Sequence, residues 1–326
     1  MTEPDRAAET LVRTLVHGRW KAQAVEAVLR LGIPELLRDG DRDLGELAGA
    51  AGADPDGLGR LMRLMVALGV FTGADGDRFG HTEDSRRLLP DHPDTQLRDA
   101  RYTLAPAVRA AWSGLEVAVR RGAPGAGPEP ADPATVHAYR AGVAVHNVPG
   151  LLAGSTLPDT GTAVMLGAHN AAALVELLRH RPGMAGVVYD GAAALARAEM
   201  VLRDAGGSVT ALAGDWLESV PAGADAYLLL HLLHDLPDEP AALLLGRVAA
   251  AMGGRAQLVA LVADRTDTGC HLLPAYLDVA QLLLCGGRER STAEYAGLFE
   301  RAGLELVERR DAGPRAGIAV LTARRR

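Results

Sequence analysis

From residue 158 onward, short apolar runs alternate with stretches long enough to form helices. Strands and helices that alternate along a chain pair into parallel βαβ units, so this pattern is typical of a doubly wound α/β sheet. The apolar runs lie at residues 163–166, 186–189, 208–212, 226–230, 257–262, 305–308 and 318–322. The helical candidates between them lie at residues 172–179, 192–204, 239–252 and 292–302. The sequence therefore predicts an α/β domain over residues 158–326, with an antiparallel hairpin of the last two strands at one edge.

The first hundred residues carry short helical patterns followed by one hairpin pattern. Apolar residues recur at close to the helical period between residues 10 and 37. Two N-cap candidates and one terminating glycine mark the further helices: Asp43, Asp54 and Gly69. Two short strand candidates then flank a turn at residues 73–77. Helices followed by a small hairpin predict a winged helix over residues 1–98.

Winged helices bind DNA or serve as dimerisation surfaces. The helix that would enter a DNA groove carries Arg60 and Arg63. Its acidic neighbours in the helix and the turn are Asp54, Asp56, Asp75 and Asp77. The formal net charge of the chain is −7, whereas a protein that releases counterions from nucleic acid needs a basic surface. We therefore expect a dimerisation surface here and no nucleic-acid partner.

The segment between the two domains, residues 99–157, is expected to be a helical linker that contributes to a substrate pocket. Two helical patterns, at residues 99–120 and 134–152, flank a loop rich in proline and glycine at residues 122–133. No apolar run approaches the roughly 20 residues that cross a bilayer, so no membrane association is expected.

The compartment is predicted from the N-terminus and the cysteines. The acidic first residues lack the apolar segment of a signal peptide. Cys270 and Cys285 have no CxxC spacing, and two free thiols are favoured over a single disulfide. Together these features predict a cytoplasmic protein.

Candidate ligand-binding residues follow the predicted strands, where open α/β sheets bind ligands. Asp190 ends the second strand, about 25 residues beyond Met165, and its carboxylate could accept from both hydroxyls of a ribose. After the third strand, Asp215 could accept from an adenine amino group while Trp216 covers the ring face. Asp190 could instead cap the next helix, and Asp215 could be an ordinary loop carboxylate. Together they suggest a site shaped for adenosine.

Histidines provide the catalytic candidates. His234 and Asp235 follow the fourth apolar run, where an imidazole with a pKa near neutrality suits a general base. Alternatively, Asp235 caps a helix and His234 is structural. His231 lies three residues earlier, but no third ligand follows at a suitable spacing, so no metal site is expected. His169, after the first strand, is either a ligand-binding or catalytic residue or a solvated loop residue.

These motifs resemble those of the dimeric, S-adenosylmethionine-dependent O-methyltransferases of plant secondary metabolism and bacterial polyketide tailoring. The resemblance rests on the winged helix, on the turn at 214–216 and on the stretches HDLPDE at 234–239 and GGRERS at 286–291. It implies a class I methyltransferase fold, Rossmann-like, with an N-terminal dimerisation domain. It further implies that His234 is the base for the acceptor hydroxyl and that Glu289 holds its imidazole. The expected partners are a second copy of the chain and a hydrophobic small molecule.

The departures from the family pattern concentrate at the methyl-donor site. The family's first loop has an acid, any residue and then Gly-x-Gly-x-Gly, whereas this chain has Met165, Gly167, His169 and Ala171 at those places. A side chain as large as that of His169 would take the space that glycine leaves for the methionine part of the cofactor. The family lysine before the catalytic histidine and its second glutamate are replaced by Leu230 and Ala260.

Three functions follow from this combination. The leading hypothesis is cofactor-independent acid/base chemistry by His234, such as cyclisation, isomerisation, elimination or a pericyclic step, on a polyketide-derived or aromatic metabolite. The donor-site residues would then be vestigial: Gly167, Asp190, Asp215 and Trp216. The first alternative is an active S-adenosylmethionine-dependent O-methyltransferase. The second is a non-catalytic partner that completes a dimer with an active homologue.

Overall fold

The computed structural model describes residues 10–74, 77–124, 133–205, 207–265, 271–312 and 317–326. The chain divides into two compact units, Met1–Pro106 and Ala107–Arg326. Cys270 and most of the predicted loop at 122–133 lie outside the described residues, whereas Cys285 is a free thiol. No helix in the described ranges is both long enough and apolar enough to span a bilayer.

The N-terminal unit combines helices with a three-stranded antiparallel sheet of order β1-β3-β2. Its strands are β1 (Arg42–Asp43), β2 (Phe71–Ala74) and β3 (Arg78–His81). Its helices are α2 (Leu11–Arg30), α3 (Ile33–Leu36), α4 (Leu44–Ala51), α5 (Pro55–Ala67), α6 (Glu83–Arg86) and α7 (Leu97–Thr103). The two predicted N-caps are confirmed, because Asp43 accepts from the Glu46 amide at 2.9 Å and Asp54 from the Gly57 amide at 2.8 Å.

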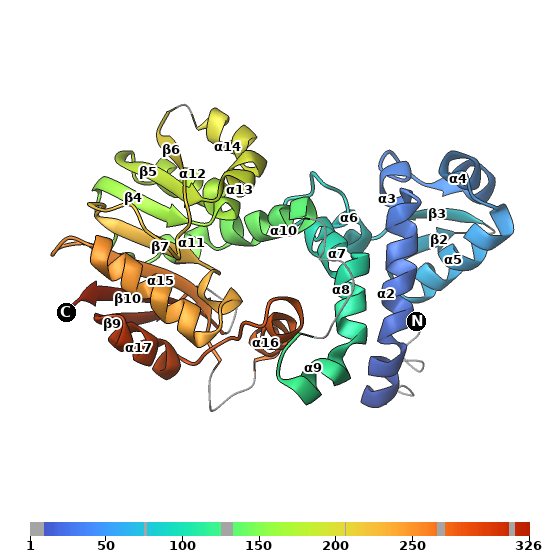
Figure 1. The fold of residues 1–326 in the computed structure, drawn as a ribbon. Helices are drawn as coiled ribbons and strands as arrows, with labels where there is room; N and C mark the ends of the chain where they lie inside the picture. Colours follow the sequence, from blue (N-terminus) through green and yellow to red (C-terminus); the bar gives the residue numbers. More distant parts are fainter. Residues whose placement is uncertain (1–9, 75–76, 125–132, 206, 266–270, 313–316) are drawn as a thin grey trace. The chain divides into compact units, whose positions relative to one another are not determined.

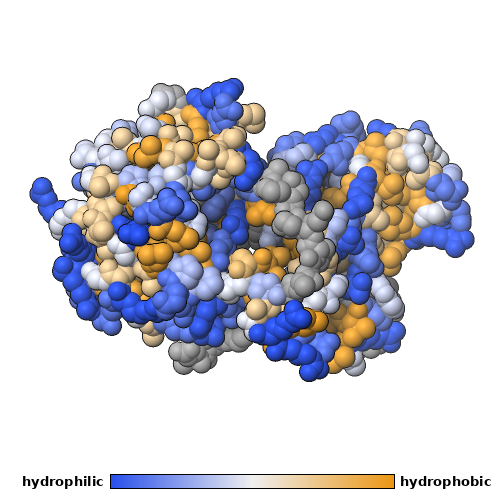
Figure 2. Space-filling model, viewed as in Figure 1, coloured by the Kyte–Doolittle hydropathy of each residue, from blue (hydrophilic) through white to orange (hydrophobic). Residues whose placement is uncertain are grey.

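Helices α2, α4 and α5 enclose an apolar core in this unit, to which Val28, Leu47 and Met62 contribute fully buried side chains. The start of α2, however, leaves large apolar side chains in solvent. Between 63% and 74% of their surface is exposed in Leu11, Val12, Leu15, Val16 and Trp20. On the face drawn in Figure 2, several hydrophobic patches lie among hydrophilic residues. Exposed apolar side chains that gather on one helix are typical of a protein–protein interface.

The C-terminal unit contains a seven-stranded sheet of order β6-β5-β4-β7-β8-β10-β9 (Figure 1). The strands are β4 (Thr160–Leu166), β5 (Gly183–Asp190), β6 (Val209–Ala213), β7 (Ala226–Leu230), β8 (Gln257–Ala263), β9 (Leu304–Asp311) and β10 (Ile318–Arg325). The first five are parallel, and β10 pairs antiparallel with β8 and β9, as the predicted edge hairpin requires. Strand order reverses between β4 and β7, which is the switch point of the sheet.

Helices cover both faces of this sheet. The remaining helices are α8 (Pro106–Ser113), α9 (Leu115–Arg121), α10 (Pro133–His146), α11 (Val148–Leu152), α12 (Ala171–Arg179), α13 (Ala192–Arg197), α14 (Glu199–Asp204), α15 (Asp238–Ala251), α16 (Leu272–Leu284) and α17 (Thr292–Arg301). Of these, α10 to α14 and α16 contribute to the apolar cluster on one face of the sheet, and α15 and α17 to the cluster on the other. Successive strand residues face opposite sides, so Met165 packs in the cluster with α12, whereas Val164 packs with α15 and α17. The result is a three-layer class I methyltransferase fold, as predicted.

Three helices that the sequence pattern joins are divided in the structure. The helix expected at 134–152 is divided at Asn147 into α10 and α11. The single helix expected at residues 99–120 forms α7, α8 and α9, because Pro106 has no amide hydrogen to continue α7 and Gly114 precedes α9. The helix expected at 192–204 is divided at Ala198 into α13 and α14.

Candidate active site

Apart from Glu289, which lies in the loop between α16 and α17, the predicted site residues lie at the carboxyl ends of strands in the large sheet. In the order of the strands they are Asp215 and Trp216 (β6), Asp190 (β5), Gly167 and His169 (β4), and His231 and His234 (β7). Two short 3₁₀ turns occupy the switch point: η1 (Ala168–Asn170) after β4 and η2 (Leu233–Asp235) after β7. Neighbouring strand ends thus bring together residues from distant parts of the chain.

His234 and Glu289 form a buried pair. Nδ1 of His234 lies 2.7 Å from Oε1 of Glu289, and Glu289 is fully buried. A carboxylate only accepts, so Nδ1 carries the hydrogen and Nε2 holds the lone pair of the neutral ring. Burial by itself lowers the pKa of His234, but the charge and hydrogen bond of Glu289 and the charge of Asp235 outweigh it and raise the pKa. The ring therefore has the tautomer and the basicity of a general base.

Asp235 binds an arginine rather than a helix terminus. Arg140, on α10, places its two terminal nitrogens 2.7 Å and 3.0 Å from the two carboxylate oxygens of Asp235. Oδ1 of Asp235 also lies 3.5 Å from Nε2 of His234. The N-cap of α15 is Pro237, so the alternative interpretation of Asp235 as a helix cap is wrong. Sequence reasoning missed Arg140, although it is the one arginine or lysine of α10.

A backbone hydrogen bond holds the loop before α17 against η2. The Arg288 amide donates to the His234 carbonyl at 2.9 Å. Gly287 permits this approach, because a Cβ built on it would lie 2.0 Å from the same carbonyl oxygen. The Glu289 amide donates to Asp278 of α16 at 2.8 Å. These contacts fix the position of the Glu289 carboxylate beside His234.

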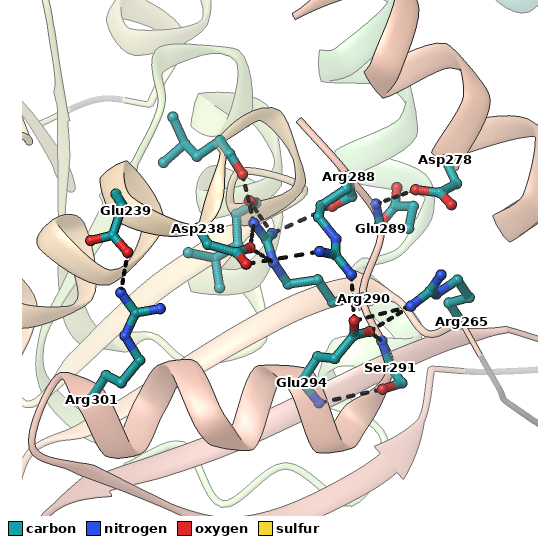
Figure 3. Close-up of polar contacts among 12 residues, drawn as sticks. Asp238, Glu239, Arg265, Asp278, Arg288, Glu289, Arg290, Ser291, Glu294 and Arg301 are labelled. Carbon is teal, nitrogen blue, oxygen red and sulfur yellow. Dashed lines mark hydrogen bonds and ion pairs between the residues drawn. The ribbon is translucent and has the colours of Figure 1, made fainter. Parts of the chain in front are cut away.

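Arg290 binds the same turn from inside the protein (Figure 3). Its buried guanidinium donates to the carbonyls of Leu233 and Leu236 at 3.0 Å and 2.8 Å. It also pairs with Asp238 at 2.7 Å. Arg290 belongs to the motif at 286–291. Its buried guanidinium satisfies carbonyl groups at η2 that have no hydrogen-bond partner within a helix.

His231 is held in one tautomer by Asn147. Nδ2 of Asn147 donates to the Val143 carbonyl at 2.9 Å, which identifies it as nitrogen, and lies 3.1 Å from Nε2 of His231. That ring nitrogen must therefore accept, and the proton of His231 lies on Nδ1. Burial lowers the pKa of His231 to about 3, so the ring is neutral at pH 7. Its backbone is left-handed, with φ of 50°, a strained conformation for histidine.

Asp190 connects β5 to the loop after β4. One carboxylate oxygen accepts from the Ala168 amide at 2.8 Å and the other from the Gly191 amide at 2.7 Å. The following helix, α13, has Gly191 at its N-cap and no side-chain cap, so the alternative of Asp190 as its cap is wrong. The carboxylate is half-buried, and each oxygen keeps a second lone pair for a ligand.

His169 is buried, which excludes its interpretation as a solvated loop residue. Its side chain lies against Gly167, where a built Cβ would be 2.8 Å from Cε1 of the imidazole. Nε2 of His169 has no hydrogen-bond partner among the described residues. Burial and then the charge of Arg140 lower its pKa well below 6.5, so the ring is neutral at pH 7. A buried polar atom without a partner is costly unless a ligand satisfies it.

The end of β6 is more open. Asp215 is exposed, and Trp216 is half-buried against the cluster that includes α15. Gly214 is required here, because a built Cβ would lie 2.1 Å from the Tyr189 hydroxyl. Among the residues that the structure describes, no group of three or more His, Cys, Asp or Glu side chains could hold a metal ion.

Comparison with known proteins identifies the family. The O-methyltransferase domain matches residues 146–305, and the O-methyltransferase dimerisation domain matches residues 14–91. The mitomycin biosynthesis 6-O-methyltransferase of Streptomyces lavendulae is 33% identical over 316 residues, which cover 92% of this chain and 90% of that protein. The chain therefore belongs to the O-methyltransferase family, as its motifs predict.

Solved structures of O-methyltransferases support the same family assignment. The mitomycin 7-O-methyltransferase MmcR matches with a TM-score of 0.90 and 30% identity over 100% of both chains. The O-methyltransferase NcsB1 from neocarzinostatin biosynthesis, in complex with S-adenosylmethionine and 2-hydroxy-5-methyl naphthoic acid, matches with a TM-score of 0.76 and 26% identity. That match covers 94% of this chain and 96% of NcsB1.

The pairing of Glu289 with His234 predicts a change that titration can measure. Glu289→Gln removes the carboxylate that most favours the imidazolium, while burial, which lowers the pKa, remains. The pKa of His234 is therefore expected to fall, and the ring to stay neutral to lower pH than in the wild type. NMR titration of the imidazole resonances measures this. Glu239→Gln is the matched control, because its carboxylate is 86% exposed and pairs with Arg301. An unchanged His234 pKa in Glu289→Gln would contradict the assignment.

Proposed function

We propose that this protein is an S-adenosylmethionine-dependent methyltransferase that methylates a hydroxyl group of an aromatic or polyketide-derived natural product. The observation that carries the proposal is the buried His234–Glu289 pair at the switch point, which leaves Nε2 of His234 as a base. The comparisons support methyl transfer over cofactor-independent chemistry, since the relatives named above are O-methyltransferases. We propose S-adenosylmethionine, the methyl donor, as the cofactor.

The described residues fit this donor. Asp190 keeps lone pairs for ribose hydroxyls, and Asp215 with Trp216 offers an acceptor and an aromatic face for adenine. At the switch point, the unpartnered Nε2 of His169 offers a polar contact. Gly167 has φ of 93°, a backbone conformation that favours glycine, so the loop keeps one glycine of the family pattern.

The bound donor would supply an electrophilic methyl group. This chain's residues would prepare the acceptor oxygen. Nε2 of His234 takes the proton of the acceptor hydroxyl, which makes the oxygen nucleophilic. Glu289 stabilises the resulting imidazolium at Nδ1, and Asp235, held by Arg140, adds a second negative charge near Nε2.

The predicted partners follow from the same residues. A hydrophobic aromatic acceptor is supported by NcsB1, whose structure contains a naphthoic acid. We propose that residues 99–157 contribute to the acceptor site, because this segment supplies Arg140 and Asn147. We also propose a homodimer through the domain at residues 1–98, which the dimerisation match and the exposed apolar start of α2 support.

A labelled-methyl assay tests the proposal. Purified protein is incubated with methyl-labelled S-adenosylmethionine and a panel of hydroxylated naphthoic acids, phenazines and anthraquinones. Transfer of label to an acceptor, with release of S-adenosylhomocysteine, is the expected result. If calorimetry detects no binding of S-adenosylmethionine or S-adenosylhomocysteine at millimolar concentration, the methyltransferase proposal is wrong.

One observation favours a second candidate, the cofactor-independent acid/base chemistry of His234. The ring of His169 fills the space beside Gly167, where the family pattern has open glycine backbone. In that case, exhaustively dialysed protein converts its substrate without a donor, and adding S-adenosylmethionine leaves the rate unchanged. Turnover that stops on dialysis and returns with S-adenosylmethionine rejects this candidate.

A further inference from the structure

The order of strands places the parts of an adenosine ligand along the sheet edge. Asp215 and Trp216 follow β6, Asp190 ends β5, and His234 follows β7. A ligand with adenine at β6 and ribose at β5 that reaches toward His234 must cross the carboxyl end of β4. Turn η1, which contains His169, occupies that end. Whatever extends beyond the ribose therefore meets His169.

The imidazole of His169 has the properties of an unfilled ligand contact. It is 9% exposed, and its Nε2 lacks a partner among the described residues. The charge that acts on it most strongly is the positive charge of Arg140. A neutral imidazole that donates N–H can bind a negatively charged group, and the positive charge of Arg140 acts in the same direction.

We propose that Nε2 of His169 donates a hydrogen bond to the carboxylate of the amino-acid part of the methyl donor. This inference rests on the proposed function. It assigns to the side chain of His169 a contact with the bound methyl donor. His169 thereby contributes to the choice between donor molecules that share adenosine but differ beyond the ribose.

Calorimetric titration with three probes tests the assignment without any turnover. S-adenosylmethionine has the whole amino-acid group, decarboxylated S-adenosylmethionine keeps only its amine, and 5′-methylthioadenosine has neither. In the wild type, S-adenosylmethionine is expected to bind more tightly than both other probes. His169→Ala is expected to weaken S-adenosylmethionine by about 10- to 100-fold, the effect of one hydrogen bond to a charged group, and to leave the other two unchanged.

Matched variants distinguish loss of the hydrogen bond of His169 from loss of its packing against the loop. His169→Gln places an amide N–H near the position of Nε2 and is expected to restore part of the affinity, whereas His169→Asn does not reach it. His180→Ala, an exposed histidine at the far end of α12, is expected to change nothing. Thermal unfolding of each variant shows whether the fold persists.

Each contrary result is distinct. If His169→Ala binds S-adenosylmethionine as tightly as the wild type, or more tightly, the ring fills space and makes no contact. An equal loss for all three probes means that His169 supports the loop alone. A loss for the first two probes means that it binds the amine and not the carboxylate. If the wild type binds 5′-methylthioadenosine and S-adenosylmethionine equally, this inference fails while the proposed function stands. If it binds no probe, both fail.

Discussion

His234→Asn is expected to reduce kcat for methyl transfer by about 10²- to 10⁴-fold, the typical contribution of a general base. Asparagine places its amide nitrogen near the position of Nδ1 and can still donate to Glu289, so the buried carboxylate keeps a partner. The Nε2 atom and its lone pair are removed. The measurement is single-turnover transfer of labelled methyl at saturating donor and acceptor.

Two controls accompany this variant. The affinity for S-adenosylhomocysteine is expected to stay within a few-fold of the wild type, because His234 is assigned to the acceptor side. His180→Ala, far from the turn, is expected to keep full activity. A rate for His234→Asn within several-fold of the wild type would show that another group takes the proton.

Gly287→Ala is expected to lower both stability and activity. The new Cβ would lie 2.0 Å from the His234 carbonyl oxygen and 2.7 Å from the Asp235 carbonyl carbon, and backbone atoms cannot yield as a flexible side chain does. Overpacking of this kind costs about 1–3 kcal/mol of unfolding free energy. The loop must also move away from η2, which separates Glu289 from His234. Denaturant unfolding and the labelled-methyl assay measure the two effects.

Gly297→Ala is the matched control. Gly297 lies inside α17, and no heavy atom is within 4 Å of its built Cβ. Alanine in a helix interior is favoured over glycine by about 0.5–1 kcal/mol, so this variant is expected to be neutral or more stable. If Gly287→Ala unfolds at the same denaturant concentration as Gly297→Ala, the loop is not fastened to η2 as described.

The sequence predicted the sheet well because its inner strands are short apolar runs separated by helix-length segments. Asp190 and His234 follow buried strands, and pattern alone places both at one edge. Local signals also predicted the caps at Asp43 and Asp54, where each carboxylate binds an amide three residues later. Such contacts depend on neighbouring residues, which a sequence displays directly.

Contacts between distant residues could not be predicted in this way. Arg140 lies 95 residues before Asp235, and Asn147 lies 84 before His231. No periodicity links such pairs. His169 illustrates a second difficulty: a polar residue in a loop usually lies in solvent, but packing here buries it against Gly167. The roles of Gly287 and Arg290 depend on carbonyl groups of another segment, which a pattern of side chains does not reveal.

Asn170 has a mechanical consequence for the catalytic edge. Its Nδ2 donates to the carbonyl of Leu166, at the end of β4, and to that of Leu230, at the end of β7. One amide thus ties together the two strand ends at which the sheet changes direction. We therefore expect the carboxyl ends of β4 and β7 to stay together when a ligand binds or leaves. We expect ligand entry and exit to depend on movement of the surrounding helices and loops, so exchange rates should respond to substitutions in α10 more than to substitutions in the strands.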